Sequence, residues 1–233
     1  GIKDVFSLGF DIVRISAVWS QIEARPGDYD FSDLILQLET ATHARTMVVV
    51  TLGMKAPRWP EFHFPAWITP DPSNTSTQAA ALAFIAATIQ ACQHYICISH
   101  WQVENEPFDH SGPENQIVHT DFLAQEIALI RKHDPRPSLV TLWGNQLSWR
   151  VHLQAAAALG DVVGIDLYPK SFAAKTPFGS LYSGPRDSYQ KIHQLTSRLA
   201  QPIWIAELQA EPWEGSSEAY RSDSPGSMSP EQL

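Results

Sequence analysis

The stretch MVVVTL, residues 47–52, decides the fold class of this chain of 233 residues. It is apolar or β-branched from end to end and shows no alternation with polar side chains. A strand of this kind is buried on both faces, as strands are in a parallel sheet covered by helices. Helical segments flank it, at residues 32–44 before it and at residues 77–93 after it. Strands that alternate with helices predict a parallel sheet with crossover helices.

The same alternation continues along the chain in both directions. Further strands are expected at residues 11–16, 98–104, 139–143, 162–167 and 203–207, and further helices at 121–132, 149–158 and 188–199. Together they make six strands, separated by five helices, in a single domain spanning residues 1–233, with a flexible loop at 214–228. A complete barrel of this kind has eight strands. The predicted fold class is therefore α/β, a (β/α)8 TIM-type barrel that is partial.

Composition supports a folded enzyme-sized domain and excludes several classes of partner. Hydrophobic residues make up 44% of the chain, enough for a large core, and the net charge is -9. An acidic surface repels phosphate backbones, so nucleic acid is not expected as a partner. No run of ~18 apolar residues is long enough to cross a bilayer. The two cysteines, Cys92 and Cys97, have no metal or redox spacing and are expected to be small buried hydrophobes.

The ends of the predicted strands are rich in tryptophan and carboxylates. Active sites of parallel barrels lie at the carboxyl ends of the strands. Five of the eight tryptophans follow such ends, namely Trp19, Trp59, Trp67, Trp143 and Trp213. Indole faces stack on the apolar C–H face of a pyranose ring while their N–H edges suit a half-wet cleft. The pattern indicates a carbohydrate site, although any one of these rings is as often part of the core.

Two glutamates end strands that are distant in sequence but near in a barrel: Glu106 and Glu207. Cleavage of a glycosidic bond needs such a pair, one carboxyl to protonate the leaving oxygen and one to attack or to activate water. Glu104 lies two residues before Glu106 and faces the same side of the strand. We prefer Glu106 because it lies closer to the carboxyl end, and we expect Glu104 to pair with Arg14 or Gln102.

WQVENEPF, residues 101–108, resembles the acid/base strand of clan A glycoside hydrolases, the retaining TIM-barrel β-glycosidases, which ends in Asn-Glu-Pro. IWIAELQAEPW, residues 203–213, resembles their strand seven, which ends in the nucleophile, here Glu207. The two glutamates are 207 − 106 = 101 residues apart, which suits the three β/α units that the family places between them. An Asn-Glu-Pro triplet alone is weak, but with a matching strand-end glutamate three units later it is specific.

The resemblance extends over nearly the whole chain. DIVRIS, residues 11–16, resembles the clan's strand two, and WSQIEARPGDYDFSDL, residues 19–34, is similar to the segment that follows it. On this alignment the six strands are two to seven, and strands one and eight are missing, including the strand-eight tryptophan. After strand three the clan often has a histidine, where this chain offers Lys55, Arg58 and His63.

The resemblance implies a function and a set of site residues. It implies a retaining hydrolase of β-glycosidic bonds, with Glu207 as nucleophile, Glu106 as acid and base, and a carbohydrate as substrate, without a cofactor or a metal. The residues expected to bind substrate or support the nucleophile are Arg14, Trp19, Trp59, Asn105, Trp143, Tyr168 and Trp213. In a retaining pair the two carboxyl groups lie ~5–5.5 Å apart.

Two other functions are compatible with parts of the pattern. A carbohydrate-binding barrel without turnover would follow if the chain is a whole protein lacking two strands, whereas a fragment would come from an enzyme. A barrel aldolase would need a Schiff-base lysine inside a strand, and no predicted strand interior carries one. Asp109, His110 and Glu114 could form a metal loop, but nothing in their spacing fixes a ligand geometry.

Overall fold

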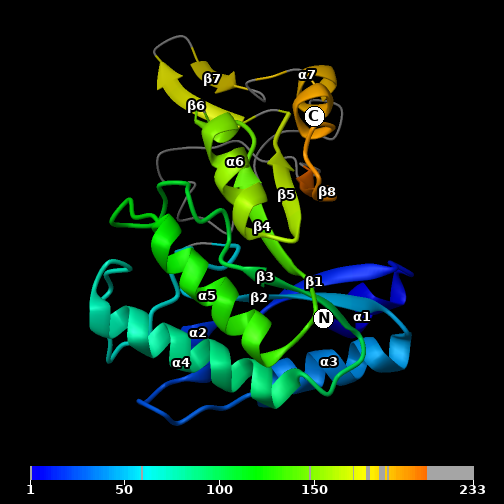
Figure 1. Ribbon diagram of the computed structural model, residues 1–233, viewed down its shortest axis with the longest axis vertical. Coiled ribbons are helices and arrows are strands. Elements are labelled where there is room, and N and C mark those ends of the chain that lie inside the picture. Colours follow the sequence, from blue (N-terminus) through cyan, green and yellow to red (C-terminus); the bar gives the residue numbers. More distant parts are fainter. Residues whose placement is uncertain are drawn as a thin grey trace.

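A computed structural model of the chain describes residues 2–58, 60–146, 148–169, 171–176, 179–183, 187 and 189–208. Its main sheet has six strands, all parallel, in the order β1-β2-β3-β4-β5-β8. The strands are β1 (Ile12–Ser16), β2 (Met47–Leu52), β3 (Ile98–Val103), β4 (Ser138–Trp143), β5 (Val162–Leu167) and β8 (Ile203–Leu208). The sheet curls into a half-barrel (Figure 1). The prediction of six parallel strands in chain order is confirmed.

Helices connect the strands of this sheet. They are α1 (Ile2–Ser7), α2 (Trp19–Ile22), α3 (Ser32–Ala44), α4 (Thr75–Cys92), α5 (Thr120–His133), α6 (Trp149–Leu159) and α7 (Tyr189–Thr196). Figure 1 shows α3, α4 and α5 side by side along one face of the sheet. Asn74 caps the N-terminus of the longest helix, α4. Its side chain accepts hydrogen bonds from the N–H groups of Ser76 and Thr77, two donors that have no partner within the helix.

A small antiparallel pair of strands between β5 and α7 was not expected from the sequence. It consists of β6 (Ser171–Thr176) and β7 (Gly179–Ser183), which pair with each other and form a separate two-stranded sheet. Figure 1 places it beyond the carboxyl end of β5. The loop predicted at 214–228 lies outside the described residues.

The core lies between the sheet and its helices. In β2 every residue from Val48 to Leu52 is buried, as the opening prediction for this strand requires. Cys92 and Cys97 are buried free thiols within the same core, so the prediction that they are small buried hydrophobes is confirmed. None of the helices among the described residues has the length and apolar character needed to cross a membrane.

The two outer strands of the described sheet expose apolar side chains. Ile12 of β1 is 42% exposed, and Ile205 and Leu208 of β8 are 51% and 62% exposed. Within the described residues each of these strands pairs on one side only.

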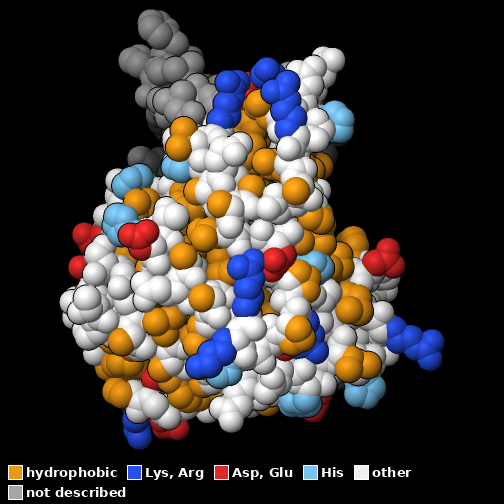
Figure 2. Space-filling view, viewed as in Figure 1, with side chains coloured by type: hydrophobic (Ala, Val, Ile, Leu, Met, Phe, Trp, Pro, Cys, Tyr) orange, Lys and Arg blue, Asp and Glu red, His pale blue; other side chains and the backbone are white. Residues whose placement is uncertain are grey.

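Basic side chains do not form one continuous patch on the face seen in Figure 2. The Lys and Arg side chains lie there in separate small groups.

Candidate active site

The carboxyl ends of β3, β5 and β8 bring three acidic side chains into one cluster. Glu106 follows β3, Asp166 lies near the end of β5, and Glu207 lies near the end of β8. Asp166 and Glu207 are direct partners in the register of β5 and β8. Glu106 and Glu207 both act electrostatically on Asp166 and on Arg14 of β1. The structure therefore brings the two predicted catalytic glutamates into the same end of the half-barrel.

The side chain of Glu207 accepts hydrogen bonds from two donors. Arg14 forms an ion pair with Glu207, and its Nη2 donates a hydrogen bond to Glu207 Oε1. The Tyr168 hydroxyl donates to Glu207 Oε2. Arg14 is fixed in turn by donating to Gln102 Oε1 at 3.2 Å. Burial and the charge of Glu207 raise the pKa of Tyr168, so its hydroxyl stays protonated and remains a donor. The two donors therefore fix the orientation of the Glu207 carboxyl group.

Glu106 has the opposite environment. Its residue is half-buried, and its Oε1 is shielded from solvent with no aligned hydrogen-bond donor among the described residues. Burial, followed by the negative charges of Asp166 and Glu207, raises the pKa of this carboxyl well above its ordinary value. A raised pKa favours the protonated form of Glu106, which is what a general acid requires.

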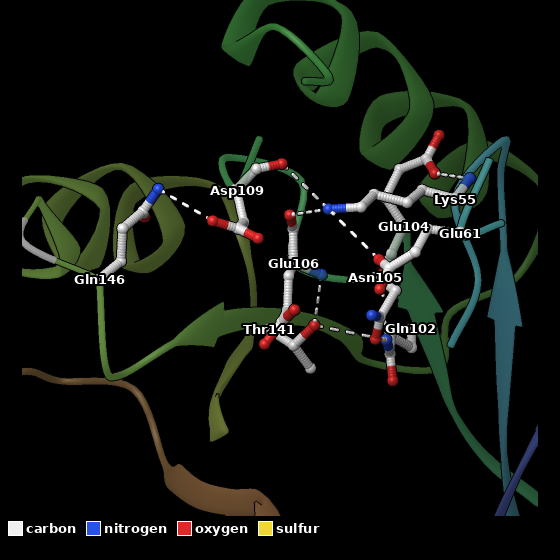
Figure 3. A network of polar contacts seen from close by, with 9 residues as sticks. All are labelled: Lys55, Glu61, Gln102, Glu104, Asn105, Glu106, Asp109, Thr141 and Gln146. Atoms are coloured by element: carbon white, nitrogen blue, oxygen red, sulfur yellow. Dashed lines mark hydrogen bonds and ion pairs between the residues drawn. The ribbon is translucent and has the colours of Figure 1, made fainter. Parts of the chain in front are cut away.

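The backbone around Glu106 is fixed by its neighbours. Glu104 and Glu106 both have positive φ angles, 59° and 43°, which is uncommon for residues with a side chain. The Glu106 N–H donates to Thr141 Oγ1 of β4 at 2.9 Å. Its carbonyl accepts from Lys55 Nζ at 2.8 Å (Figure 3). These contacts hold the turn in a conformation that aims the Glu106 side chain towards the cluster.

Lys55 is the buried anchor of this turn. Its side chain is fully buried, and besides Glu106 it donates to the carbonyl of Asp109 at 3.1 Å and lies 3.7 Å from Glu61 Oε2 (Figure 3). The sequence suggested Lys55 as a substitute for a sugar-binding histidine. The structure corrects this, because an ammonium group that is wholly buried and bonded to two carbonyls offers nothing to a sugar.

We expect Lys55→Met to lower the free energy of unfolding by about 2–4 kcal/mol, because it leaves the buried carbonyls of Glu106 and Asp109 without their donor. Urea denaturation followed by tryptophan fluorescence measures the change. Lys132→Met is the matched control, since Lys132 is exposed on α5 and its loss should alter stability by less than about 0.5 kcal/mol. Equal stability of the two variants would contradict the anchoring role of Lys55.

Glu104 belongs to a separate buried pair. Its carboxylate accepts from the N–H groups of Met54, at 2.9 Å, and Lys55, and it lies beside Glu126 of α5. Burial and the charge of Glu104 raise the pKa of Glu126 well above its ordinary value, which favours the protonated form of Glu126 in this contact. The expected pairing of Glu104 with Arg14 or Gln102 is therefore wrong. Gln102 reaches only the backbone carbonyl of Glu104.

Gly53 makes room for the Glu104 carboxylate. Its φ is +116°, and a Cβ atom at this position would lie 2.4 Å from Cδ of Glu104. Any side chain here would displace Glu104 from its two backbone donors. The carboxylate of Glu104 therefore explains why a glycine follows β2 at position 53.

The remaining predicted site residues divide into three groups. Asn105 lies beside Glu106, buried, with its Oδ1 accepting from Gln102 at 3.3 Å. Trp143, half-buried at the end of β4, is the register partner of Asp166. Trp59 and Trp213 lie outside the described residues.

Trp19 is the exception. It is 0% exposed, stacked on Phe84 of α4 with ring centroids 5.7 Å apart, and its Nε1 donates to Glu23. The prediction that Trp19 binds substrate is therefore wrong, because α2 turns the indole into the helix-packed core.

Comparison with known proteins points to one kind of fold. No family model matches the chain, and no curated protein matches it. Among solved structures it is similar to GH5_18 from Streptomyces cattleya in complex with GlcNAc, at a TM-score of 0.58 and 16% identity, over 71% of this chain and 45% of that one. It is also similar to a beta-glucosidase from Exiguobacterium marinum, at a TM-score of 0.60 and 14% identity, over 90% of this chain and 66% of that one.

A third similar structure is a beta-galactosidase from the Antarctic haloarchaeon Halorubrum lacusprofundi, at a TM-score of 0.63 and 13% identity, over 93% of this chain and 45% of that one. The chain thus spans between 45% and 66% of the length of these three proteins. Structural similarity at identities this low supports a similar fold but does not identify the reaction. The α/β half-barrel of this chain is thus similar in fold to parts of these three solved structures.

Proposed function

We propose that the protein is a retaining glycoside hydrolase that cleaves β-linked sugars by double displacement, as a member of clan A. The observation that carries the proposal is the contrast between two carboxyls at one end of the half-barrel. Glu207 accepts hydrogen bonds from Arg14 and Tyr168, while burial and neighbouring negative charge raise the pKa of Glu106. A carboxyl group whose pKa is raised suits the role of the acid, and a carboxyl group oriented by a cation and a hydroxyl suits that of the nucleophile.

In the first step Glu207 attacks the anomeric carbon and Glu106 protonates the departing oxygen. A bond forms between a Glu207 oxygen and the sugar while the glycosidic C–O bond breaks. The proton that Glu106 carries goes to the leaving oxygen, so no alkoxide is released. Arg14 and Tyr168 hold the attacking carboxylate in position for the sugar.

In the second step Glu106, now a carboxylate, takes a proton from water. The water oxygen bonds to the anomeric carbon as the ester to Glu207 breaks, and Glu207 returns to its ionised form. Two inversions at the same carbon give net retention. A pair working in this way needs its carboxyl groups ~5–5.5 Å apart.

Substrate contacts are proposed for residues near the pair. Asn105 is placed beside Glu106 and would hold the sugar 2-hydroxyl, and Trp143 would stack on a sugar ring. The same stacking role is proposed for Trp59 and Trp213. In the clan's numbering the six parallel strands β1 to β5 and β8 would be strands two to seven.

The test is the stereochemistry of the first product. Aryl β-glycosides of glucose, galactose and mannose are incubated with the purified protein, and proton NMR follows the anomeric signal before mutarotation. The expected first product is the β-anomer. Initial release of the α-anomer would mean an inverting enzyme, and binding of sugars without any release would favour a carbohydrate-binding barrel.

A further inference from the structure

Asp166 is a buried carboxyl that the mechanism above does not use. It lies on β5, in the otherwise uncharged strand VVGIDL, and is 0% exposed. Its register partners are Glu207 on β8 and Trp143 on β4. A charged side chain is almost never fully buried unless something pairs with it. The question is what pairs with Asp166.

One neighbour of the Asp166 carboxyl is that of the acid Glu106. The Glu106 carboxyl and the Glu207 backbone N–H both lie within hydrogen-bonding reach of Asp166. Neither oxygen of Asp166, nor Oε1 of Glu106, has an aligned donor among the described residues. Two carboxylates cannot satisfy one another, since both are acceptors. The contact is favourable only if a hydrogen lies between them.

The charges around the pair point the same way. Arg14 faces Glu106, Asp166 and Glu207 together, but its guanidinium is bonded to Glu207. Lys55 attracts Glu106, but its ammonium group donates to backbone carbonyls and it also faces the acid Glu61. The hydroxyl of Tyr168, which also lies near these carboxyl groups, donates to Glu207. One bound guanidinium cannot neutralise three carboxylates, so the excess charge is removed by protonation.

We propose that Asp166 is a positioning residue of the acid, with its carboxyl and that of Glu106 sharing a hydrogen that keeps Glu106 loaded for proton donation. This inference rests on the proposed function, because it assigns Asp166 a part in the same reaction. Burial, followed by the charge of Glu207, raises the pKa of Asp166 to about 8, which agrees with a pair that keeps its hydrogen at neutral pH. Such a pair titrates as a unit rather than as two separate residues.

Charge balances across the reaction under this arrangement. When Glu207 bonds to the sugar it loses its negative charge, and Glu106 gains one as its proton moves to the leaving oxygen. The pair can carry that extra charge at this stage because the neighbouring carboxylate has been neutralised as an ester. Uptake of a proton from the attacking water restores the shared hydrogen as Glu207 becomes ionised again.

The test is Asp166→Asn in the purified full-length protein. An amide removes the like charge and donates a hydrogen bond to Glu106, so it favours the ionised acid. We expect the alkaline limb of the kcat/KM profile to move to lower pH by about one unit or more. Substrates with poor leaving groups should lose ~10-fold to 100-fold at neutral pH, whereas dinitrophenyl glycosides should change little.

The control is Asp134→Asn, which neutralises a buried carboxylate that pairs with Arg136 near the start of β4, at the opposite end of the barrel. It should leave the pH profile in place. An alkaline limb that is unchanged in Asp166→Asn would overturn the proposal. So would an equal loss on good and poor leaving groups, because that is the result of a merely structural role.

If Asp166→Asn does not fold, NMR titration of carboxyl-labelled wild-type protein decides the matter. Two carboxyl signals that titrate together above their ordinary range support the pair, and signals that all titrate in the ordinary range refute it. The titration also separates the two proposals. A coupled pair in a protein that hydrolyses no glycoside would sink the proposed function alone, whereas turnover without such a pair would sink only the role of Asp166.

Discussion

Replacing Glu207 with alanine should lower kcat/KM on aryl β-glycosides by at least about 10⁴-fold, the largest loss expected from any substitution in this chain. The variant has no nucleophile, and Arg14 and Tyr168 are left without the carboxylate that they bind. Azide is a small nucleophile that fits the vacated space. It should restore turnover and give the glycosyl azide of inverted, α configuration, because it replaces one displacement of the two.

The control for this substitution is Glu114→Ala, which removes an exposed glutamate from the loop after β3 and should leave kcat/KM unchanged. Product configuration by NMR is the decisive measurement. A Glu207→Ala enzyme that keeps wild-type turnover, or that gives a β-azide, would show that another group attacks the sugar.

Replacing Glu106 with alanine should produce a loss that depends on the leaving group. Natural glycosides and other poor leaving groups should lose ~10²–10⁴-fold, because their oxygen must be protonated as it departs. Dinitrophenyl glycosides need little acid help, so the glycosylation step should be spared and the glycosyl-enzyme should accumulate. Azide should then speed its breakdown and give the β-azide, with retained configuration, because the first displacement by Glu207 has already occurred.

Burst kinetics with dinitrophenyl glycosides measure this accumulation, and Glu114→Ala again serves as control. Full activity of Glu106→Ala on a natural glycoside would falsify its assignment as the acid. The pH profile provides a second readout: the alkaline limb of kcat/KM, set by ionisation of the raised carboxyl, should disappear for substrates that no longer depend on it.

The strands could be predicted because burial on both faces leaves a plain record in the sequence. MVVVTL and VVGIDL are short apolar runs, and their spacing by helical segments permits few arrangements other than a parallel sheet. Glu106 and Glu207 were found because the carboxyl ends of parallel strands meet, so strand-end position restricts the search. Contacts of Arg14 and Tyr168 with Glu207 followed from the family resemblance rather than from the pattern itself.

Side-chain direction was harder to predict than strand position. Trp19 follows β1 directly, yet the single turn of α2 carries it into the core, and no periodicity extends over four residues. Lys55 was offered as a substitute for the clan's histidine, but its side chain is fully buried, which is rare for a charged residue. Glu104, which follows β3, lies beside Glu126 of α5. A contact between two buried acidic side chains leaves no recognisable pattern in the sequence.

Two features of the structure, the buried Asp166 and the β6–β7 pair, were not predicted from the sequence. Asp166 is the one charged residue in an apolar strand, and a buried charge requires a partner. The β6–β7 pair was missed because its two runs, SFAAKT and GSLYS, are short and lack the alternation that marks a half-buried hairpin.

The buried carboxyls make folding a proton-binding reaction. Glu126 and Glu106 have pKa values raised well above the ordinary range in the folded chain, and that of Asp166 is raised to about 8. In the unfolded chain such groups ionise at roughly pH 4, so between there and their folded pKa values the native state holds more protons. Stability from these groups is complete below the unfolded pKa and is lost as pH rises through the folded one. These buried carboxyl groups therefore make the native state less stable as the pH rises.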